Sequence, residues 1–206
     1  GHCTQIIVPR ERVPEKFMNP LLTFIKRNVL SLGTALLALA VFTCLSSINF
    51  LLFHSFAEIF SIIIGVTIFL NTWNTAKIID NGYLVVLGVA CFFISFIDFI
   101  HLLTYKGMSV LEVSQSADVS TQLWIGARYL ESGTFLLAAF FTRYNPGLKR
   151  TFGVYAALSA LFLLSVFTWD VFPACYIEGS GLTAFKKGSE YLISLLRSLS
   201  RGFTVL

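Results

Sequence analysis

The chain has 206 residues, of which 56% are hydrophobic and only 13% are charged, with a formal net charge of +4 and a mean hydropathy of +0.78. Soluble domains carry about a quarter charged residues, so this composition excludes an ordinary soluble globular domain and indicates a membrane protein. The basic residues are spread over the polar segments, which excludes the concentrated basic patch of a nucleic-acid-binding protein.

Apolar segments of about twenty residues recur along the chain, the length that crosses a bilayer as a helix. The clear ones are 29–50, 54–73, 82–103, 120–142 and 151–172. A sixth begins near Leu182 and meets Arg197 and Arg201 before it is long enough. We therefore predict an all-α integral membrane protein, a multi-helix transmembrane bundle with five clear spans and an incomplete sixth. Gly126 and Gly133 predict positions where neighbouring helices approach closely.

The basic residues of the loops predict the orientation, because cytoplasmic loops are enriched in Lys and Arg. One set of alternating segments carries most of them: Arg10, Arg12, Lys16, Lys26, Arg27, Lys77, Arg143, Lys149 and Arg150. The other set is mainly acidic, and in the loop 104–118 Lys106 stands against Glu112 and Asp118. Both termini are therefore predicted to be cytoplasmic, with residues 1–28 as an N-terminal arm.

Ionisable residues occur in pairs inside three of the predicted spans. The pairs are His54 with Glu58, Asp98 with His101, and Arg128 with Glu131. Members of each pair are three or four residues apart and share a helix face. The predicted topology puts all three pairs, and Trp124 near the rim, in the outer half of the bilayer. Because charges in lipid are costly, we predict one polar pocket between the second, third and fourth spans.

Three acids against one arginine leave two negative charges in that pocket, which favours a cation, a proton or a cationic ligand. The donors His54, Glu58, Asp98 and His101 are of the types that ligate zinc, copper or iron. Haem is a weaker candidate, because both histidines lie near the outer rim. In the structural alternative, Arg128 pairs with Asp98 or Glu58 and only holds the helices together.

The motifs FHSFAEIFSIIIG (53–65), FIDFIHLLTYKGM (96–108), TQLWIGARYLES (121–132) and IEGSGLTAFKKGSEYLIS (177–194) occur in this order. With them the chain resembles the third type of bacterial membrane-associated sensor domain over about residues 30–195. This resemblance implies a non-enzymatic input module of histidine kinases and diguanylate cyclases. The sequence by itself requires no cofactor. It adds Tyr105 and Lys106 to the polar positions named above.

The resemblance leads us to expect a transmembrane sensor domain at 29–196 and a truncated cytoplasmic tail at 197–206. The expected partners are the lipid bilayer, a kinase or cyclase effector normally in the same chain, and a second copy by analogy, with no nucleic acid. The expected location is the bacterial inner membrane. Two alternatives stay open: a proton-coupled transporter that uses the same acids, and a metal- or haem-binding redox subunit.

Overall fold

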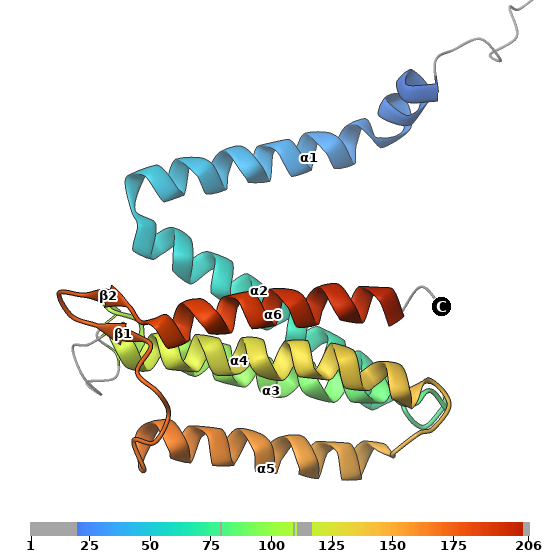
Figure 1. The fold of residues 1–206 in the computed structure, drawn as a ribbon. Coiled ribbons are helices and arrows are strands. Elements are labelled where there is room, and N and C mark those ends of the chain that lie inside the picture. Colours follow the sequence, from blue (N-terminus) through green and yellow to red (C-terminus); the bar gives the residue numbers. More distant parts are fainter. Residues whose placement is uncertain (1–19, 79, 109, 111–116, 204–206) are drawn as a thin grey trace, which may run out of the picture. The chain divides into compact units, whose positions relative to one another are not determined.

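The computed structural model describes residues 20–78, 80–108, 110 and 117–203 (Figure 1). Most of the predicted N-terminal arm, Glu112 and the last three residues lie outside this range. The elements in chain order are α1 (Pro20–Ile48), α2 (Phe50–Thr75), α3 (Gly82–Thr104), α4 (Ala117–Ala138), the 3-10 helix η2 (Ala139–Thr142), α5 (Leu148–Phe167), β1 (Tyr176–Ile177), β2 (Gly181–Leu182) and α6 (Ala184–Phe203).

The chain forms two units, one that ends at Ile48 and one that begins at Asn49. Four described helices are long and apolar enough to cross a membrane, at Arg27–Ile48, Phe50–Thr75, Gly82–Thr104 and Leu148–Phe167. Helix α4 forms where the fourth span is predicted, but it carries Asp118, Arg128 and Glu131 and is less apolar. The all-α membrane fold is thus confirmed, while the count of five spans stays a prediction.

Side-chain caps mark where three helices begin. The Oδ1 atoms of Asn49 and Asn81 accept hydrogen bonds from the backbone N–H groups of Leu52 and Leu84, at 3.1 and 3.2 Å. Thr183 Oγ1 accepts from an N–H of the first turn of α6 at 3.2 Å. Each cap satisfies an N–H group that the helix leaves without a partner, so these residues fix where α2, α3 and α6 begin.

Helix α5 ends at Phe167, five residues before the predicted end of the fifth span at residue 172. The chain turns back here, because Asp170 adopts a left-handed φ of 49° and the N–H groups of Val171 and Phe172 donate to the Ser165 carbonyl. An Asp tolerates this conformation better than most residues. The apolar residues beyond Phe167 therefore form a turn, which composition alone did not distinguish from helix.

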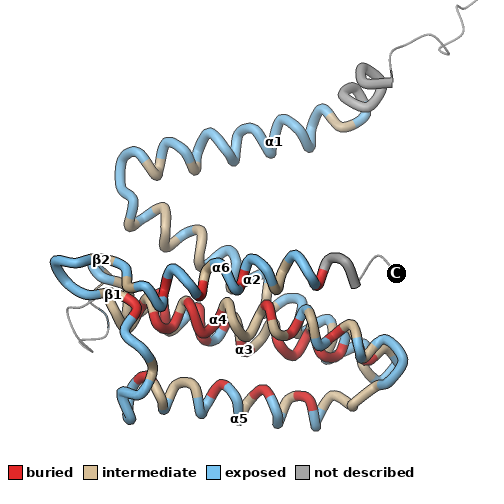
Figure 2. The backbone as a smooth tube through the Cα atoms, in the orientation of Figure 1, coloured by how far each residue is buried: buried red, intermediate tan, exposed pale blue. Residues whose placement is uncertain are grey.

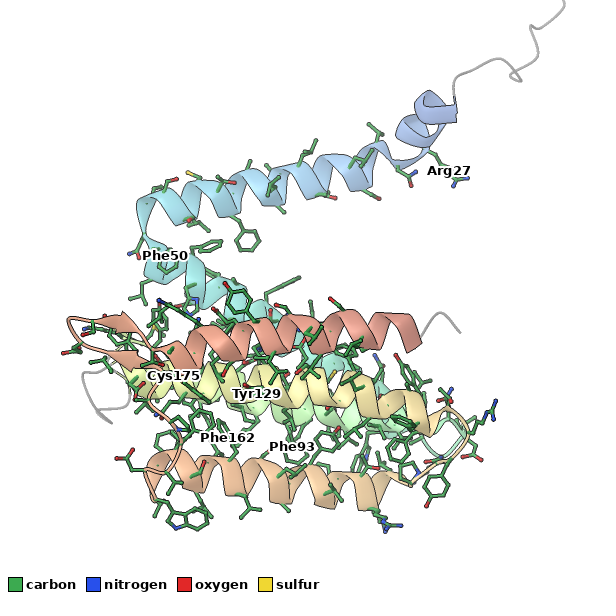
Figure 3. The ribbon with its side chains drawn as sticks, in the orientation of Figure 1. Arg27, Phe50, Phe93, Tyr129, Phe162 and Cys175 are labelled. Atoms are coloured by element: carbon green, nitrogen blue, oxygen red, sulfur yellow. The ribbon has the colours of Figure 1, made fainter. Side chains whose placement is uncertain are left out.

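Helices α3 and α4 form the centre of the second unit (Figure 1). Helix α2 packs on α3, α6 packs on α4, and α5 contacts both central helices. Buried positions concentrate on α3 and α4 (Figure 2). Aromatic residues, including Phe93 and Phe162, fill the space between this pair and α5 (Figure 3). A polar residue buried on α3 or α4 is therefore surrounded by other helices of the bundle.

The two glycines singled out on α4 differ in their surroundings. A Cβ at Gly126 would overlap the ring of Phe162 on α5, whereas a Cβ at Gly133 would meet nothing within 4 Å. Close packing is therefore confirmed at Gly126, and the same interpretation of Gly133 is wrong. A glycine allows close helix packing only if it lies on the face that meets another helix. The presence of a glycine in the sequence does not show which face it occupies.

Helix α6 buries polar and small residues and exposes apolar ones. Lys186, Ser189, Ile193 and Ser200 are buried, while its exposed face carries Phe185, Tyr191, Leu192, Leu195 and Leu199. This distribution is the one expected when lipid surrounds the outer face. The helix continues through Arg197 to Phe203, although α6 is not among the described helices that are long and apolar enough to cross a membrane. Arginine is a good helix former, and the Arg197 side chain pairs with Glu131 on α4.

A short antiparallel hairpin, β1–β2, follows α5 and leads into α6. Asp118 Oδ1 at the start of α4 accepts hydrogen bonds from the N–H groups of Cys175 and Tyr176, at 2.6 and 2.7 Å. Lys106 and Glu178 form an exposed ion pair at 3.0 Å. Burial, and then the neighbouring charge of Asp118, raise the pKa of the Cys175 thiol to about 12. The hairpin is thus fixed to the end of the bundle where α3 ends and α4 begins.

Candidate functional site

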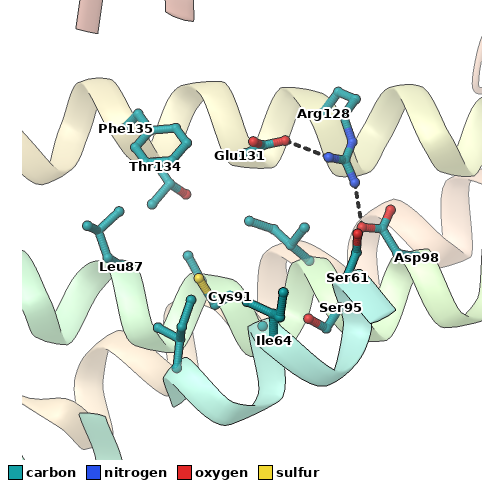
Figure 4. Close-up of a pocket in the computed structure, with 14 residues that line it drawn as sticks. Ser61, Ile64, Leu87, Cys91, Ser95, Asp98, Arg128, Glu131, Thr134 and Phe135 are labelled. Atoms are coloured by element: carbon teal, nitrogen blue, oxygen red, sulfur yellow. Dashed lines mark hydrogen bonds and ion pairs between the residues drawn. The ribbon is translucent and has the colours of Figure 1, made fainter. Parts of the chain in front are cut away.

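An ion-pair network, defined here as Asp98, Arg128, Glu131 and Arg197, joins three helices. Figure 4 shows its first three residues. Arg128 on α4 pairs with Asp98 on α3 and, at 2.8 Å, with Glu131 one turn along its own helix. Glu131 also accepts a hydrogen bond from Arg197 on α6 at 2.7 Å. The chain of opposite charges therefore runs from α3 through α4 to α6.

The network is partly removed from solvent. Asp98 is only 4% exposed, and its Oδ1 atom and Arg128 Nε are buried without a hydrogen-bond partner. A buried charge is stable only when an opposite charge compensates it. Here each acid of the network forms an ion pair with an arginine. Arg197 also changes the charge count. Three acids, with Glu58 included, now stand against two arginines, which leaves one negative charge where the sequence predicts two.

A cavity of about 250 Å³ lies between α2, α3 and α4, beside the network (Figure 4). Asp98, Arg128 and Glu131 line its polar part. The remainder is mostly apolar or weakly polar and includes Ile64, Leu87, Cys91, Ser95 and Phe135. This cavity gives the ion pairs a space next to them in which a side chain, a water molecule or a small ligand fits.

A second polar group, the histidine cluster, consists of His54, Glu58 and His101 from α2 and α3. One ligand atom from each residue lies within 4.8 Å of those from the other two. The His54 ring stands 5.6 Å from the His101 ring, nearly at right angles, and 4.1 Å from the Tyr105 ring, centroid to centroid. The packing of α2 on α3 thus brings together the polar faces that residue spacing creates on each helix.

A backbone hydrogen bond fixes the orientation of His101. Its Nδ1 atom lies 2.7 Å from the carbonyl oxygen of Ser120 on α4. Because a carbonyl oxygen only accepts, Nδ1 carries the proton, and in the neutral ring Nε2 carries the lone pair. That Nε2 atom and the Nε2 of His54 are buried without a hydrogen-bond partner. Two buried nitrogen atoms of the histidine cluster, one from each histidine, therefore lack a hydrogen bond.

A larger cavity, of about 550 Å³, adjoins the histidine cluster near the hairpin. Its lining includes His54, His101, Tyr105 and Trp124, with Lys186 and Glu190 from α6. Lys186 lies 4.9 Å from the centre of the Trp124 ring and also pairs with Glu190. One part of the cavity lining thus places the Lys186 ammonium group over the Trp124 ring, and another part consists of the two histidines.

The eight residues predicted to form one pocket lie in two neighbouring groups. Asp98, Arg128 and Glu131 belong to the network, and His54, Glu58 and His101 form the cluster. Tyr105 and Trp124 line the larger cavity beside the histidines. The metal set predicted with Asp98 is reduced to three residues, because Asp98 pairs with Arg128 and lies outside the cluster.

Helix α6 supplies an inward-facing stripe of three polar residues and one isoleucine, which hydropathy alone does not reveal. Lys186, Glu190, Ile193 and Arg197 recur at three- and four-residue intervals and face α4 or its neighbours. This helical periodicity was visible in the sequence and would have placed Arg197 on the inner face. The segment was interpreted by its hydrophobic length instead, for which Arg197 counts as an interruption.

Helices with apolar outer faces and ionisable residues between them define a membrane-embedded helical domain. The sequence profile of the membrane-associated sensor domain family (MASE3) matches residues 45–205, and the chain belongs to this family. It is thus a transmembrane sensor domain of signal transduction, which confirms the resemblance. Comparisons with curated proteins and with solved structures gave no match.

Proposed function

We propose that this chain is the sensory input module of a bacterial inner-membrane signalling protein, with a kinase or cyclase effector that follows α6 in the cytoplasm. A stimulus changes the pairing within the ion-pair network, and the change alters how α6 packs on α4. The single observation that supports this proposal most is that Glu131 is shared by Arg128 and Arg197.

A shared acid provides two alternative pairings. When Arg128 binds Asp98 and Glu131 together, Glu131 still holds Arg197. If a ligand or a proton takes one of these acids, the arginines redistribute and the contact between α4 and α6 changes. Two packings that differ by a few kcal/mol suffice for a switch, because a stimulus needs only to favour one of them.

The loop charges support the orientation that this relay needs. Arg143, Lys149 and Arg150 lie at the end of the bundle where α4 passes into α5, and α6 runs toward the same end (Figure 1). Basic loops favour the cytoplasmic side. The acidic hairpin end then faces outward, and α6 leads inward toward the effector.

The test is a fusion in which α6 continues into a diguanylate cyclase reporter, expressed in cells that lack other cyclases. We expect Glu131→Gln and Asp98→Asn to change cyclase output severalfold, because each removes a charge that fixes the pairing of the arginines. Glu178→Gln, which breaks only the exposed pair with Lys106, is the matched control. Unchanged output in both network variants, at equal levels in the membrane, would contradict the proposal.

A further inference from the structure

We propose that His54, Glu58 and His101 bind a divalent transition-metal ion. Within the described part of the chain, these three residues bring one ligand atom each to within 4.8 Å of the other two. They come from two helices that pack closely along their length, so the site is built on rigid elements. This inference stands apart from the sensory role and concerns what the chain binds.

The hydrogen bonding of His101 leaves it ready to act as a ligand. The residue is only 4% exposed, and its Nδ1–H donates to the Ser120 carbonyl. In protein metal sites a ligating histidine commonly donates its other N–H to such a carbonyl, which fixes the ring and the tautomer. The Nε2 lone pair of His101 consequently points into the cluster without a partner.

His54 and Glu58 complete the donor set. The Nε2 atom of His54 is also buried without a hydrogen-bond partner, and burying such an atom is costly unless something binds it. Glu58 lies one turn along α2 from His54 and contributes a carboxylate oxygen. A metal ion would satisfy both nitrogens and would draw on the negative charge that the neighbouring acids leave uncompensated.

The donor types indicate the class of metal. Two imidazoles and one carboxylate occur together in catalytic zinc sites and in non-haem iron sites, both of which keep a position open for a further ligand. Metal–nitrogen bonds of about 2.0–2.1 Å place neighbouring donors about 3.3 Å apart. Separations of up to 4.8 Å therefore need only modest side-chain rotation to close around an ion.

A single ion fits this arrangement better than haem. The carboxylate of Glu58 lies within 4.8 Å of a nitrogen of each histidine, so a third donor stands close to both possible axial ligands and leaves little room for a porphyrin ring. The open position would face the cavity of about 550 Å³, which is lined by His54 and His101 and extends toward the hairpin. A small ligand would reach the metal through it.

Metal binding at this site would also act on the ion-pair network. The charges of Asp98 and Arg128 both interact with that of Glu58, and His101 is one helical turn from Asp98. A cation held by Glu58 removes part of the negative field at Arg128. The two sites are therefore coupled electrostatically, and each would change the charge balance of the other.

The test uses the full chain, purified in detergent with a tag free of histidine and stripped with a chelator. Co²⁺ is titrated while visible absorption reports its coordination, and Zn²⁺ then competes for the site. We expect one Co²⁺ per chain, displaced by Zn²⁺. Glu58→Gln and His101→Gln should each weaken binding at least about tenfold, because loss of outer partners alone costs about 10–100-fold.

Two control variants separate this site from adventitious binding. His2→Ala removes the third histidine of the chain, and Glu178→Gln removes an exposed acid, so both should bind Co²⁺ as the unaltered chain does. Circular dichroism and a single elution peak check that each variant is folded. Binding below one ion per chain, or binding that Glu58→Gln leaves unchanged, would overturn the proposal. Neither result affects the cyclase fusion, so the two proposals fail separately.

Discussion

The ion-pair network and the histidine cluster lie side by side, yet they differ in whether each group has a partner of opposite charge. Helix α3 contributes to both, with Asp98 in the network and His101 in the cluster, one turn apart. In the network every charged side chain has an opposite charge within 2.8 Å. In the cluster, the buried Nε2 atoms of His54 and His101 have no hydrogen-bond partner.

This difference separates a site whose side chains compensate one another's charge from a site whose buried nitrogens have no partner. Compensated charges in a low-dielectric interior stabilise the helix packing that brings them together, and removing one partner is costly. The two buried histidine nitrogens have no such ion-pair partner, and their burial is unfavourable until something binds. We therefore expect substitutions in the network to act on stability and those in the cluster to act on ligand binding.

The largest expected effect is that of Arg128→Gln. It leaves Asp98 and Glu131 with less compensation, and Asp98 is nearly fully buried. Breaking a buried pair by removing one partner costs about 3–5 kcal/mol, so the variant should unfold at much lower denaturant. The measurement is reversible unfolding in mixed micelles, followed by helical circular dichroism.

The matched change in the cluster is His54→Phe, measured with a chelator present. The new ring retains the aromatic contact with Tyr105 and removes a buried nitrogen without a partner. We expect the free energy of unfolding to change by less than about 1 kcal/mol. If His54→Phe were as destabilising as Arg128→Gln, the proposed contrast between the two sites would be wrong.

An effect smaller than that of Arg128→Gln but larger than that of His54→Phe is expected from Gly88→Ala, which tests whether the cluster depends on the spacing of α2 and α3. A Cβ at Gly88 would overlap the side chain of Thr72 on α2, including its Cβ, so the helices must separate. Overpacking of this kind costs about 1–3 kcal/mol. Co²⁺ binding should weaken as well, because the donors lie on the two helices that move apart. Gly133→Ala, which meets nothing within 4 Å, should leave both stability and binding intact.

The smallest effect concerns the hairpin beside the larger cavity, and Cys175 reports it. In a chain whose other cysteines are replaced by Ser, maleimide should label Cys175 slowly even at pH 9, because the thiol is buried and its pKa of about 12 keeps it protonated. Asp118→Ala removes the acceptor of two hairpin N–H groups and should speed labelling several-fold.

Asp118→Asn removes the same charge but keeps an acceptor oxygen at the same place, so it serves as the control and should speed labelling less than Asp118→Ala does. Equal labelling in Asp118→Ala and Asp118→Asn would mean that these two hydrogen bonds do not hold the hairpin. In that case Asp118 does not control how readily the hairpin beside the larger cavity opens.

Patterns along one helix were predictable from the sequence, because they depend only on the helical period. The pairing of His54 with Glu58 and of Asp98 with His101 follows from residues three or four apart sharing a face. Long apolar stretches likewise predicted α2 and α3 closely. The end of α5 was predicted five residues too late, because the turn at Asp170 depends on backbone hydrogen bonds that hydropathy does not encode.

The sequence by itself therefore determined a helical membrane domain, its family, and the residues that form its polar interior. Only the tertiary structure decided which of those residues meet. It paired Asp98 with Arg128, brought Arg197 from α6 onto Glu131, and left the two histidines facing Glu58. The physical reason is that contacts between helices depend on their packing and relative rotation, which sequence spacing along a single helix does not contain.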